Sequence, residues 1–581
     1  RERHGYDPVP HLALLFCDEP GAMEFRLHWH RTINSLFEEN FSRQLGEWCA
    51  AHGIALTGHY MCEHGVYAQQ NWGVRIMPNY RHQQIPGIDH LGRQISERIT
   101  AKQCQSVVNR YRKPRMLSEL YGVAGGGLSF EDRKWIALQQ LCLGVNLLNP
   151  HLSLYTMAGC RKRDFPQNIF YQQPWWPLNH VLDVALSRLC AALSQGRYLA
   201  ETLIIHPQES AMALWRTRTA QFAERLGFLG GGQDWNSPTE EAQARIEQLE
   251  RDFLAWIDGL LGHQHPFDLG DEEILSTAAA VARDAQGVAW LRVGAASYRC
   301  VVIPTLATMR QSTFDLLREF EQAGGIVVRG GGFPARLDGR GCVELEAWGA
   351  TLSDCTPGEF ARRHAPAFDG ALRVDSVASG NRELCWTHQR LLADGSVLAF
   401  IVNLDRQREL RAGFRLRGEW PCIARCDEND GELHPLASAS GADGALDIAL
   451  APCECRLLWL AKKRMANSRM SAAATPAGGD QPAQRPLALD WSARRLDDNA
   501  LTLDYAAWRC GDDPWSAGEV PVIELQQALN RERYDGALSL RYSFRVDELT
   551  GGRSLRLVLE YPERCRVFVN DEDVAGRGGA T

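Results

Sequence analysis

Two glutamates are the strongest candidates for chemistry in this sequence. Glu63 and Glu119 each lie at or near the end of an apolar stretch that we expect to be a strand, IALTGHYMCE (54–63) and MLSELYG (116–122). Cleavage of a glycosidic bond needs two carboxyl groups, one as acid and the other as base or nucleophile. Apolar and charged neighbours push the pKa values of such a pair apart, so that one carboxyl stays protonated near neutral pH. Two glutamates at equivalent strand ends favour this chemistry over the alternatives, a salt bridge or a helix cap.

Polar and aromatic residues beside these glutamates are candidates for substrate binding. His59 and Tyr60 lie just before Glu63. Asp89, in IPGIDHLG (85–92), follows a Pro-Gly pair that is typical of a tight turn. We interpret Asp89 as either a substrate contact or a helix N-cap.

A third predicted strand, GVNLLNPHLSLY (144–155), adds further candidates. Side chains alternate along a strand, so His151, Ser153 and Tyr155 would share one face. We expect His151 and Tyr155 to line a pocket there, and the alternative for His151 is a hydrogen-bonded core residue. The loop that follows combines charged and aromatic side chains: Arg161, Arg163, Asp164, Tyr171, Trp175 and Trp176. Aromatic rings stack on the CH faces of sugars while polar groups bind their hydroxyls, although simple packing also explains the Trp pair.

Helical and strand-like segments alternate through residues 1–195, and this alternation must position the candidate residues. The expected helices cover residues 37–48, 96–113 and 130–143, and the expected strands cover 54–63, 116–122 and 144–155. Polar residues gather at the carboxyl ends of these strands, where a (β/α)8 TIM barrel carries its active site. A doubly wound sheet is the competing geometry. The run GVAGGG (122–127) lacks the spacing of a dinucleotide-binding loop, so we interpret it as a plain loop.

The 581 residues predict about four domains. A flavodoxin-like, amidotransferase-like α/β domain is expected because apolar strands alternate with helices after residue 198, but no GxCxG elbow is present. Short strands between turns predict β-sandwiches in the second half. The predicted domains are the C-terminal part of a barrel (1–197), the α/β domain (198–345), a β-sandwich (346–461), a flexible linker (462–486) and a truncated sugar-binding-like β-sandwich (487–581).

Composition excludes several classes of protein. Apolar residues make up 45% and charged residues 23%, which is typical of a folded chain and excludes a mostly disordered one. A formal charge of −8 argues against a nucleic-acid partner, and the absence of an apolar run of about 18 residues argues against a membrane span. The 17 cysteines are odd in number and contain no CxxC pair, so we expect buried free thiols and slightly favour the cytoplasm. No motif for a cofactor or metal is evident.

Several of these segments together resemble a known family. They are GEWCAAHGIALTGHYMCE (46–63), IPGIDHLG (85–92), AKQCQSVVNRYRKPRMLSELYG (101–122), LGVNLLNPHLSLY (143–155) and GCRKRDFPQN (159–168). They resemble large bacterial glycoside hydrolases of the family 106 type, a group associated with α-L-rhamnosidase activity. The resemblance covers about residues 1–345. The α/β region also looks like the amidotransferase-like domain of family 42 β-galactosidases, and the tail looks like the sugar-binding sandwich of family 2 enzymes.

The resemblance implies roles for individual residues. RERHGYD (1–7) would belong to a helix after the fourth barrel strand, so the chain would start just past the acidic tip of that strand and carry strands five to eight. Glu119 would then lie at the seventh strand, the position of the base or nucleophile. Glu63 would lie at the fifth, as an acid/base partner or a carboxylate that positions the substrate. Glu19, in CDEP (17–20), would be a lookalike in a loop. The resemblance also implies that the reaction inverts the configuration at the anomeric carbon and depends on calcium, although no local calcium loop is visible in the sequence.

These observations predict a glycoside hydrolase that removes terminal sugars, with α-L-rhamnose as the first candidate, truncated at both ends. A β-galactosidase-like hydrolase is the second interpretation. The third is a carbohydrate-binding protein that has lost catalysis. The expected partner is a carbohydrate, without nucleic acid or membrane.

Overall fold

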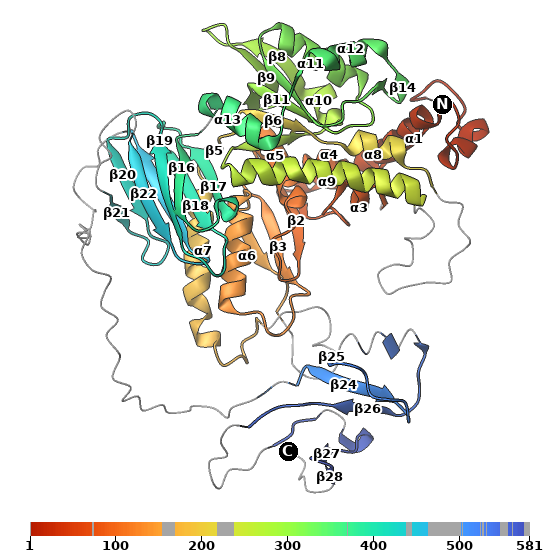
Figure 1. The fold of residues 1–581 in the computed structure, drawn as a ribbon, viewed down its shortest axis with the longest axis vertical. Helices are drawn as coiled ribbons and strands as arrows, with labels where there is room; N and C mark the ends of the chain where they lie inside the picture. The colour runs from red at the N-terminus through yellow and green to blue at the C-terminus, as the bar shows by residue number, and fades with distance from the viewer. Residues whose placement is uncertain are drawn as a thin grey trace. The chain divides into compact units, whose positions relative to one another are not determined.

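The computed structural model divides the chain into two compact units, residues 1–153 with 167–485 and residues 154–166 with 486–581 (Figure 1). The first unit is described over residues 2–71, 75–153, 169–217, 238–368, 370–436 and 444–462. The second is described over residues 501, 503–522, 525, 528–529, 532–546, 556–559 and 562–574. Tyr155, Arg161, Arg163, Asp164 and most of the predicted linker therefore lie outside the described residues.

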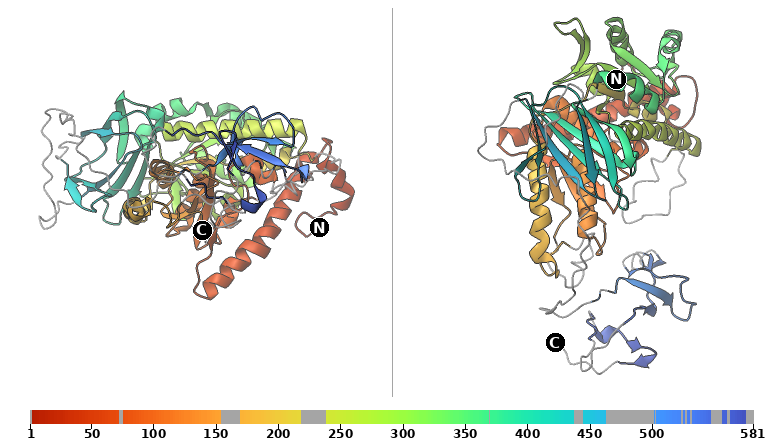
Figure 2. Two further views of the ribbon diagram at one scale, coloured as in Figure 1. Left: turned by 90° about the horizontal axis from the view of Figure 1, so that it is seen from below. Right: turned by 60° about the vertical axis from the view of Figure 1, so that its left-hand side comes forward.

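The first unit begins with a long helical stretch. After a short 3-10 helix, α1, a π-helical turn and α2 follow one another without a break, from residue 22 to residue 51. Their bounds are η1 Val9–Leu15, α1 Ala22–Phe37, η2 Glu38–Arg43 and α2 Gln44–Ala51. The predicted amphipathic helix is present, but its apolar side is open: Phe41 and Trp48 are 48% and 54% exposed. Figure 2 shows this stretch projecting from the body of the unit.

A four-stranded parallel sheet follows, in the order β1-β2-β3-β4. The strands are β1 Thr57–Gly58, β2 Ile85–Leu91, β3 Leu117–Gly122 and β4 Leu147–Pro150. The helices between and after them are α3 Val66–Asn71, α4 Met77–Tyr80, α5 Ile99–Tyr111, α6 Phe130–Cys142, η4 Trp176–Leu178 and α7 Asn179–Leu193. A capping box between Ser129 and Asp132 starts α6. Parallel strands need crossover connections, and the helices between the strands provide them. The alternation of helices and strands that the sequence predicts is therefore present in this sheet.

Three details of this sheet differ from the predictions. The stretch 54–63 was expected to be a buried strand, but only Thr57–Gly58 pairs and Ile54 is 55% exposed. Pro86 and Gly87 lie inside β2 instead of in a turn, so Asp89 is a strand residue and caps no helix. A Cβ on Gly87 would lie 2.8 Å from the Gly58 carbonyl oxygen, which is why glycine fits this close approach.

The second sheet has five parallel strands in the order β15-β12-β11-β6-β7. They are β6 Thr202–Ile205, β7 Phe267–Gly270, β11 Cys300–Pro304, β12 Ile326–Gly330 and β15 Ser353–Asp354. This is the strand order 2-1-3-4-5 of a flavodoxin-like, doubly wound sheet. Its helices are α8 Gln208–Leu214, α9 Glu240–Gly262, α10 Glu272–Ala278, α11 Gln311–Gln322, α12 Val343–Thr351 and α13 Pro357–Phe368.

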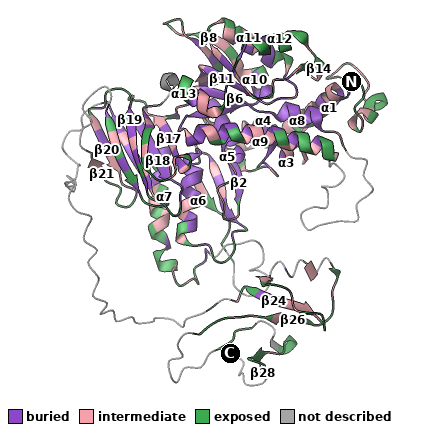
Figure 3. Ribbon diagram, viewed as in Figure 1, coloured by how far each residue is buried: buried purple, intermediate pink, exposed green. Residues whose placement is uncertain are grey.

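Short antiparallel strands that the sequence analysis missed accompany this sheet. They are β8 Ala279–Arg283, β9 Ala289–Val293, β10 Ala296–Tyr298, and the pair β13 Arg336–Leu337 and β14 Arg340–Gly341. The first three form a sheet of their own. One core joins the two parallel sheets, and it includes Leu141 from α6, Leu203 from β6 and Phe253 from α9. In Figure 3 the buried colour covers most of β6 and α5.

Two antiparallel sheets complete the first unit. A six-stranded sheet has the order β21-β20-β23-β18-β17-β5 and a three-stranded sheet the order β16-β19-β22. Their strands are β5 Arg197–Tyr198, β16 Leu372–Ser379, β17 Cys385–Leu391, β18 Val397–Asn403, β19 Leu410–Leu416, β20 Cys422–Cys426, β21 Leu433–Pro435, β22 Ala445–Leu450 and β23 Cys455–Ala461, with η6 Arg382–Leu384. Apolar residues of both sheets share a second core, as facing sheets do. β5 lies before the α/β sheet in sequence but pairs with β17.

The second unit contains small sheets in its described part. β25-β24-β26 is one sheet and β27-β28 is another. The bounds are β24 Tyr505–Cys510, β25 Val520–Pro521, β26 Leu538–Arg541, η7 Pro562–Arg564, β27 Phe568–Val569 and β28 Glu572–Asp573. Residues 556–559 lie outside any strand. Over the described residues of both units, none of the helices has the length and apolarity to cross a membrane.

Candidate active site

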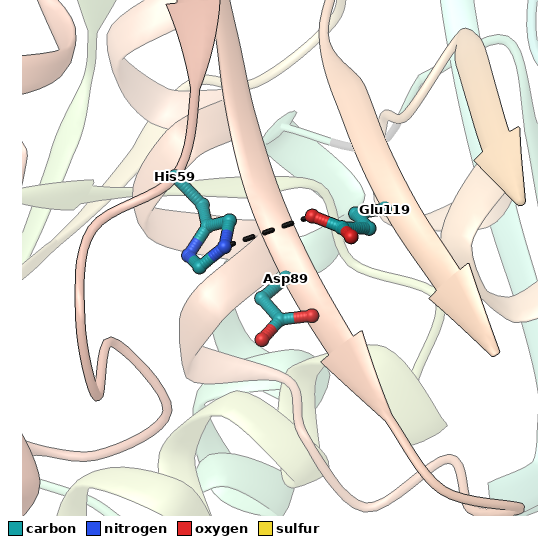
Figure 4. A group of neighbouring side chains, drawn as sticks. All are labelled: His59, Asp89 and Glu119. Carbon is teal, nitrogen blue, oxygen red and sulfur yellow. Dashed lines mark ion pairs between the residues drawn. The ribbon is translucent and has the colours of Figure 1, made fainter. Parts of the chain in front are cut away.

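The carboxyl ends of the four parallel strands bring two carboxylates and two imidazoles together. Figure 4 shows three of these residues, His59, Asp89 and Glu119. Asp89 of β2 and Glu119 of β3 are register partners on adjacent strands. His59 comes directly after β1, and its Nε2 lies 3.6 Å from Glu119 Oε2. His151 comes directly after β4, and its Nε2 lies 3.6 Å from Glu119 Oε1. We call these four residues the Glu119 cluster, since Glu119 is placed between the two imidazoles.

The alternation of β3 explains which way Glu119 points. Ser118 and Leu120 are buried on the side of α6, where Ser118 Oγ donates to Gln140 Oε1 at 3.1 Å. Glu119 therefore lies on the opposite face, with a quarter of its side chain exposed. A carboxylate that is held by neighbours and still reaches solvent can meet a ligand.

Burial and neighbouring charges shift the pKa values of Asp89 and His59. Burial raises the pKa of Asp89, and the Glu119 carboxylate raises it further, while His59 opposes the shift. For His59, burial disfavours the charged form, but the Tyr60 carbonyl and the nearby carboxylates Glu63, Asp89 and Glu119 together raise its pKa. The site therefore favours a protonated imidazole beside Glu119.

Glu63 lies beneath this cluster and is 3% exposed. Its Oε1 accepts the backbone N–H of Asp89 at 2.7 Å, and its Oε2 accepts the Tyr80 hydroxyl. Burial raises the pKa of Glu63 to about 7, and hydrogen bonds from Tyr80 and Asp89 oppose that shift. In this structure the carboxylate contacts protein groups and holds β2 against the loop that follows β1.

The backbone of Glu63 is anchored as well. Its carbonyl oxygen accepts hydrogen bonds from the side chains of Gln69 (3.3 Å), Gln103 (3.1 Å) and Thr100 (3.5 Å). These donors come from α3 and α5, so helices behind the sheet determine where the loop containing His59 lies.

Glu97 is a residue that the sequence analysis missed. Burial raises its pKa to about 7, and the charge of Asp89 contributes to that rise. It precedes α5 by two residues, in a segment without a strand, so the search for carboxylates at strand ends could not detect it.

The remaining predicted residues divide into buried and exposed groups. Tyr60 is a core residue whose hydroxyl lies 2.9 Å from Ser42 Oγ, so it faces away from solvent. Trp175 packs edge-on against Phe130, with 5.1 Å between the centres of the two rings, which agrees with the packing interpretation. Tyr171 and Trp176 are exposed. Glu19 is exposed just before α1 and lines a different hollow, with α1 and α9.

The donor atoms of His59, Asp89 and Glu119 lie within 4.8 Å of one another, which makes them a possible metal-binding set. Calcium takes six to eight oxygen ligands, mostly carboxylates and carbonyls. Two carboxylates and an imidazole nitrogen do not fit that requirement, so the calcium expectation gains no support from these residues. A second possible metal-binding set consists of Asp427, Asp430 and His434. Its carboxylates already form ion pairs with protein groups, since Asp430 lies 2.9 Å from His434 and Asp427 lies 3.0 Å from Arg425.

The comparisons with known proteins rest on structure. No protein-family profile matches the chain, and no curated protein matches its sequence. A rhamnosidase from Novosphingobium sp. PP1Y is similar with a TM-score of 0.58 and 13% identity, over 89% of this chain and 46% of its own. Gan42B, a GH42 β-galactosidase, has a TM-score of 0.52 and 12% identity, over 77% of this chain and 69% of its own. A catalytic mutant of Gan42B from G. stearothermophilus has a TM-score of 0.51 and 12% identity, over 76% and 69%.

At these identities the likeness shows a shared mixed α/β fold, and the proteins that share it are glycoside hydrolases. The chain spans less than half the length of the rhamnosidase that it matches.

Proposed function

We propose that this chain carries the catalytic carboxylate of a glycoside hydrolase that removes terminal sugars. The observation that carries the proposal is the placement of Glu119 between His59 and His151, with Asp89 beside it, at the carboxyl edge of a parallel sheet. The shared fold with a rhamnosidase and a β-galactosidase supports the same reaction class. A carbohydrate is accordingly the proposed partner.

The four-stranded sheet is, in this proposal, part of a (β/α)8 barrel. Its strands lie in chain order and are joined by helices, as barrel strands are. Barrel enzymes carry their active sites at the carboxyl ends of the strands, and the Glu119 cluster lies at that end. Asp89 and Glu119 share one layer, because the register pairs them across β2 and β3.

Glu119 is the general base or the nucleophile in this mechanism. As a base it takes a proton from the water that attacks the anomeric carbon, while the glycosidic bond breaks and the leaving oxygen takes up a proton. As a nucleophile it bonds to the anomeric carbon as the same glycosidic bond breaks, and water then releases the sugar and restores the carboxylate in a second step. The imidazoles of His59 and His151 on either side hold the carboxylate in place. Asp89 accepts a hydrogen bond from a sugar hydroxyl, and Glu63 positions Asp89 through its backbone.

The proposed substrate is a terminal α-L-rhamnoside, which follows the rhamnosidase neighbour and the sequence resemblance. A β-D-galactoside is the second candidate, because the chain covers a larger share of the β-galactosidase than of the rhamnosidase. Aryl α-L-rhamnoside and aryl β-D-galactoside assayed side by side separate the two. Release of neither aryl group, with sugar binding retained, would instead indicate a carbohydrate-binding protein without catalysis.

A further inference from the structure

A second hollow lies at the carboxyl edge of the five-stranded sheet. Its volume is about 500 Å³, within the range of small-molecule sites. It is lined by Asp252, Ala255 and Trp256 of α9, Thr305, Gly330–Gly332, Asp354–Thr356, and Pro357 and Glu359 at the start of α13. We call it the α9 cleft. None of its residues belongs to the Glu119 cluster.

The α9 cleft lies at the carboxyl ends of three neighbouring strands. Thr305 follows β11, Gly331 follows β12 and Cys355 follows β15. In doubly wound sheets ligands bind outside the carboxyl ends of the strands, at the point where the strand order reverses. That point lies between β6 and β11 in this sheet, so the cleft lies beside it and shares the end of β11 with it.

Gly330 ends β12, and Gly331 and Gly332 follow it as exposed residues on the lining of the cleft. A Cβ on Gly330 would lie 2.2 Å from the Trp256 ring, and a Cβ on Gly331 would lie 2.4 Å from Thr305 Oγ1. Trp256 Nε1 donates to the Gly330 carbonyl at 2.7 Å and holds α9 close to this loop. The wall is therefore formed by backbone, an indole and small side chains, and its shape is held by hydrogen bonds.

The charged residues of the cleft determine what it accepts. Asp252, Asp354 and Glu359 lie on its lining, and Asp354 pairs with Arg329 at 3.3 Å. Three carboxylates repel phosphates, so the glycine run is not a nucleotide site. Glu359 accepts the Thr356 N–H and hydroxyl through Oε2, and Asp252 accepts Gln248 Nε2 through Oδ1. These bonds engage one oxygen of each carboxylate, and a carboxylate has acceptor capacity for further ligand hydroxyls.

We propose that the α9 cleft is a second carbohydrate-binding site, for a neutral mono- or disaccharide. Sugar hydroxyls donate to the carboxylates, while the Thr305 hydroxyl donates to a ring or hydroxyl oxygen. The apolar surfaces of Ala255 and Pro357 match the CH faces of a sugar ring. Such a site would bind sugar without taking part in bond cleavage.

Titration calorimetry of the full chain with L-rhamnose, D-galactose and lactose tests this site. Ala255→Trp fills the cleft from the exposed side of α9, and Ala244→Trp places the same side chain on an exposed position of the same helix outside the cleft. Asp252→Asn replaces a charged acceptor by a neutral one, which we expect to weaken binding about tenfold. Glu119→Gln leaves the cleft intact.

For at least one sugar, we expect the Glu119→Gln and Ala244→Trp variants to bind one more molecule per chain than Ala255→Trp does. The same number of bound molecules in Ala255→Trp, or the absence of binding by all three sugars at millimolar concentrations, would overturn the proposal. Turnover of aryl glycosides is measured separately, and Ala255→Trp leaves the Glu119 cluster untouched, so a failure of the proposed reaction is distinguishable from a failure of this site.

Discussion

The backbone N–H of Asp89 donates to the buried carboxylate of Glu63 at 2.7 Å. This bond joins the loop after β1 to the middle of β2, and it separates the roles of two acidic residues. Glu63 is held inside the protein, whereas Asp89 lies beside Glu119 at the open face. The carboxylate beside Glu119 in the cluster is therefore Asp89.

Replacing Glu119 with Gln should abolish turnover with the fold retained. An amide can neither take a proton from water nor form a glycosyl intermediate, so kcat/KM for the responsive aryl glycoside should fall by about 10²–10⁴ or more. Far-UV circular dichroism checks the fold. Turnover equal to that of the unmodified chain would show that Glu119 does not take part in the reaction.

Replacing Glu63 with Leu should lower stability. It leaves the Asp89 amide and the Tyr80 hydroxyl without their acceptor, at a cost of about 1–3 kcal/mol for each unsatisfied buried group. Urea unfolding measures this loss. Glu63→Gln is the matched control, because its amide oxygen can still accept the Asp89 N–H. Equal stability of the two variants would argue that the bond contributes nothing.

Glu63 should also make stability depend on pH. Its pKa is about 7 in the folded state against an ordinary value of 4.5, so between these values the folded chain binds more protons than the unfolded one. Stability then falls as pH rises from about 4.5 through 7, with a slope of at most about 1.4 kcal/mol per pH unit. In Glu63→Gln, the free energy of unfolding measured across pH 5–8 should change less with pH than in the parent chain. A variant that loses stability as steeply as the parent would assign the dependence to another group, such as Glu97.

His59 should shape the alkaline limb of the activity profile. Nearby carboxylates raise its pKa, so the imidazole stays protonated to a higher pH than an isolated histidine. Activity should decline as pH rises through that raised pKa, because the positive charge beside Glu119 is lost. In His59→Gln this limb should disappear while overall activity falls. An unchanged alkaline limb in the variant would exclude His59 as its origin.

Replacing Glu209 with Gln should strongly destabilise the chain. This fully buried carboxylate pairs with Arg75 at 2.8 Å and Arg310 at 2.6 Å, and also with Arg31. Neutralising it removes the buried carboxylate that the three arginines share, and breaking a buried ion pair typically costs about 3–5 kcal/mol. Asp338→Asn removes a partly exposed partner of Arg31 and should cost less than about 1 kcal/mol. Similar midpoints of urea unfolding for the two variants would contradict this account.

The sequence predicted the elements that depend on local pattern. The helical pattern identified α5 and α6, and an apolar run identified β3, because burial of a helix or of a parallel strand leaves a direct trace in the residue order. The position of Glu119 on β3 followed from the same pattern. The local pattern gave wrong predictions at two places. Residues 54–63 were expected to be a strand but form mostly loop, and Pro86–Gly87 were expected to form a turn but lie within a strand.

The grouping of the site was decided by tertiary structure. His59, Asp89, Glu119 and His151 are separated by about 30 residues each, and only the pairing of parallel strands brings their ends to one edge. The sequence alone could identify Glu63 and Glu119 as acidic strand ends, yet it could not show that Glu63 is buried beneath β2 and that Asp89 is the neighbour of Glu119. Burial and register are properties of the packed sheet, since they depend on which strands meet and in what alignment, and no local pattern of residues encodes them.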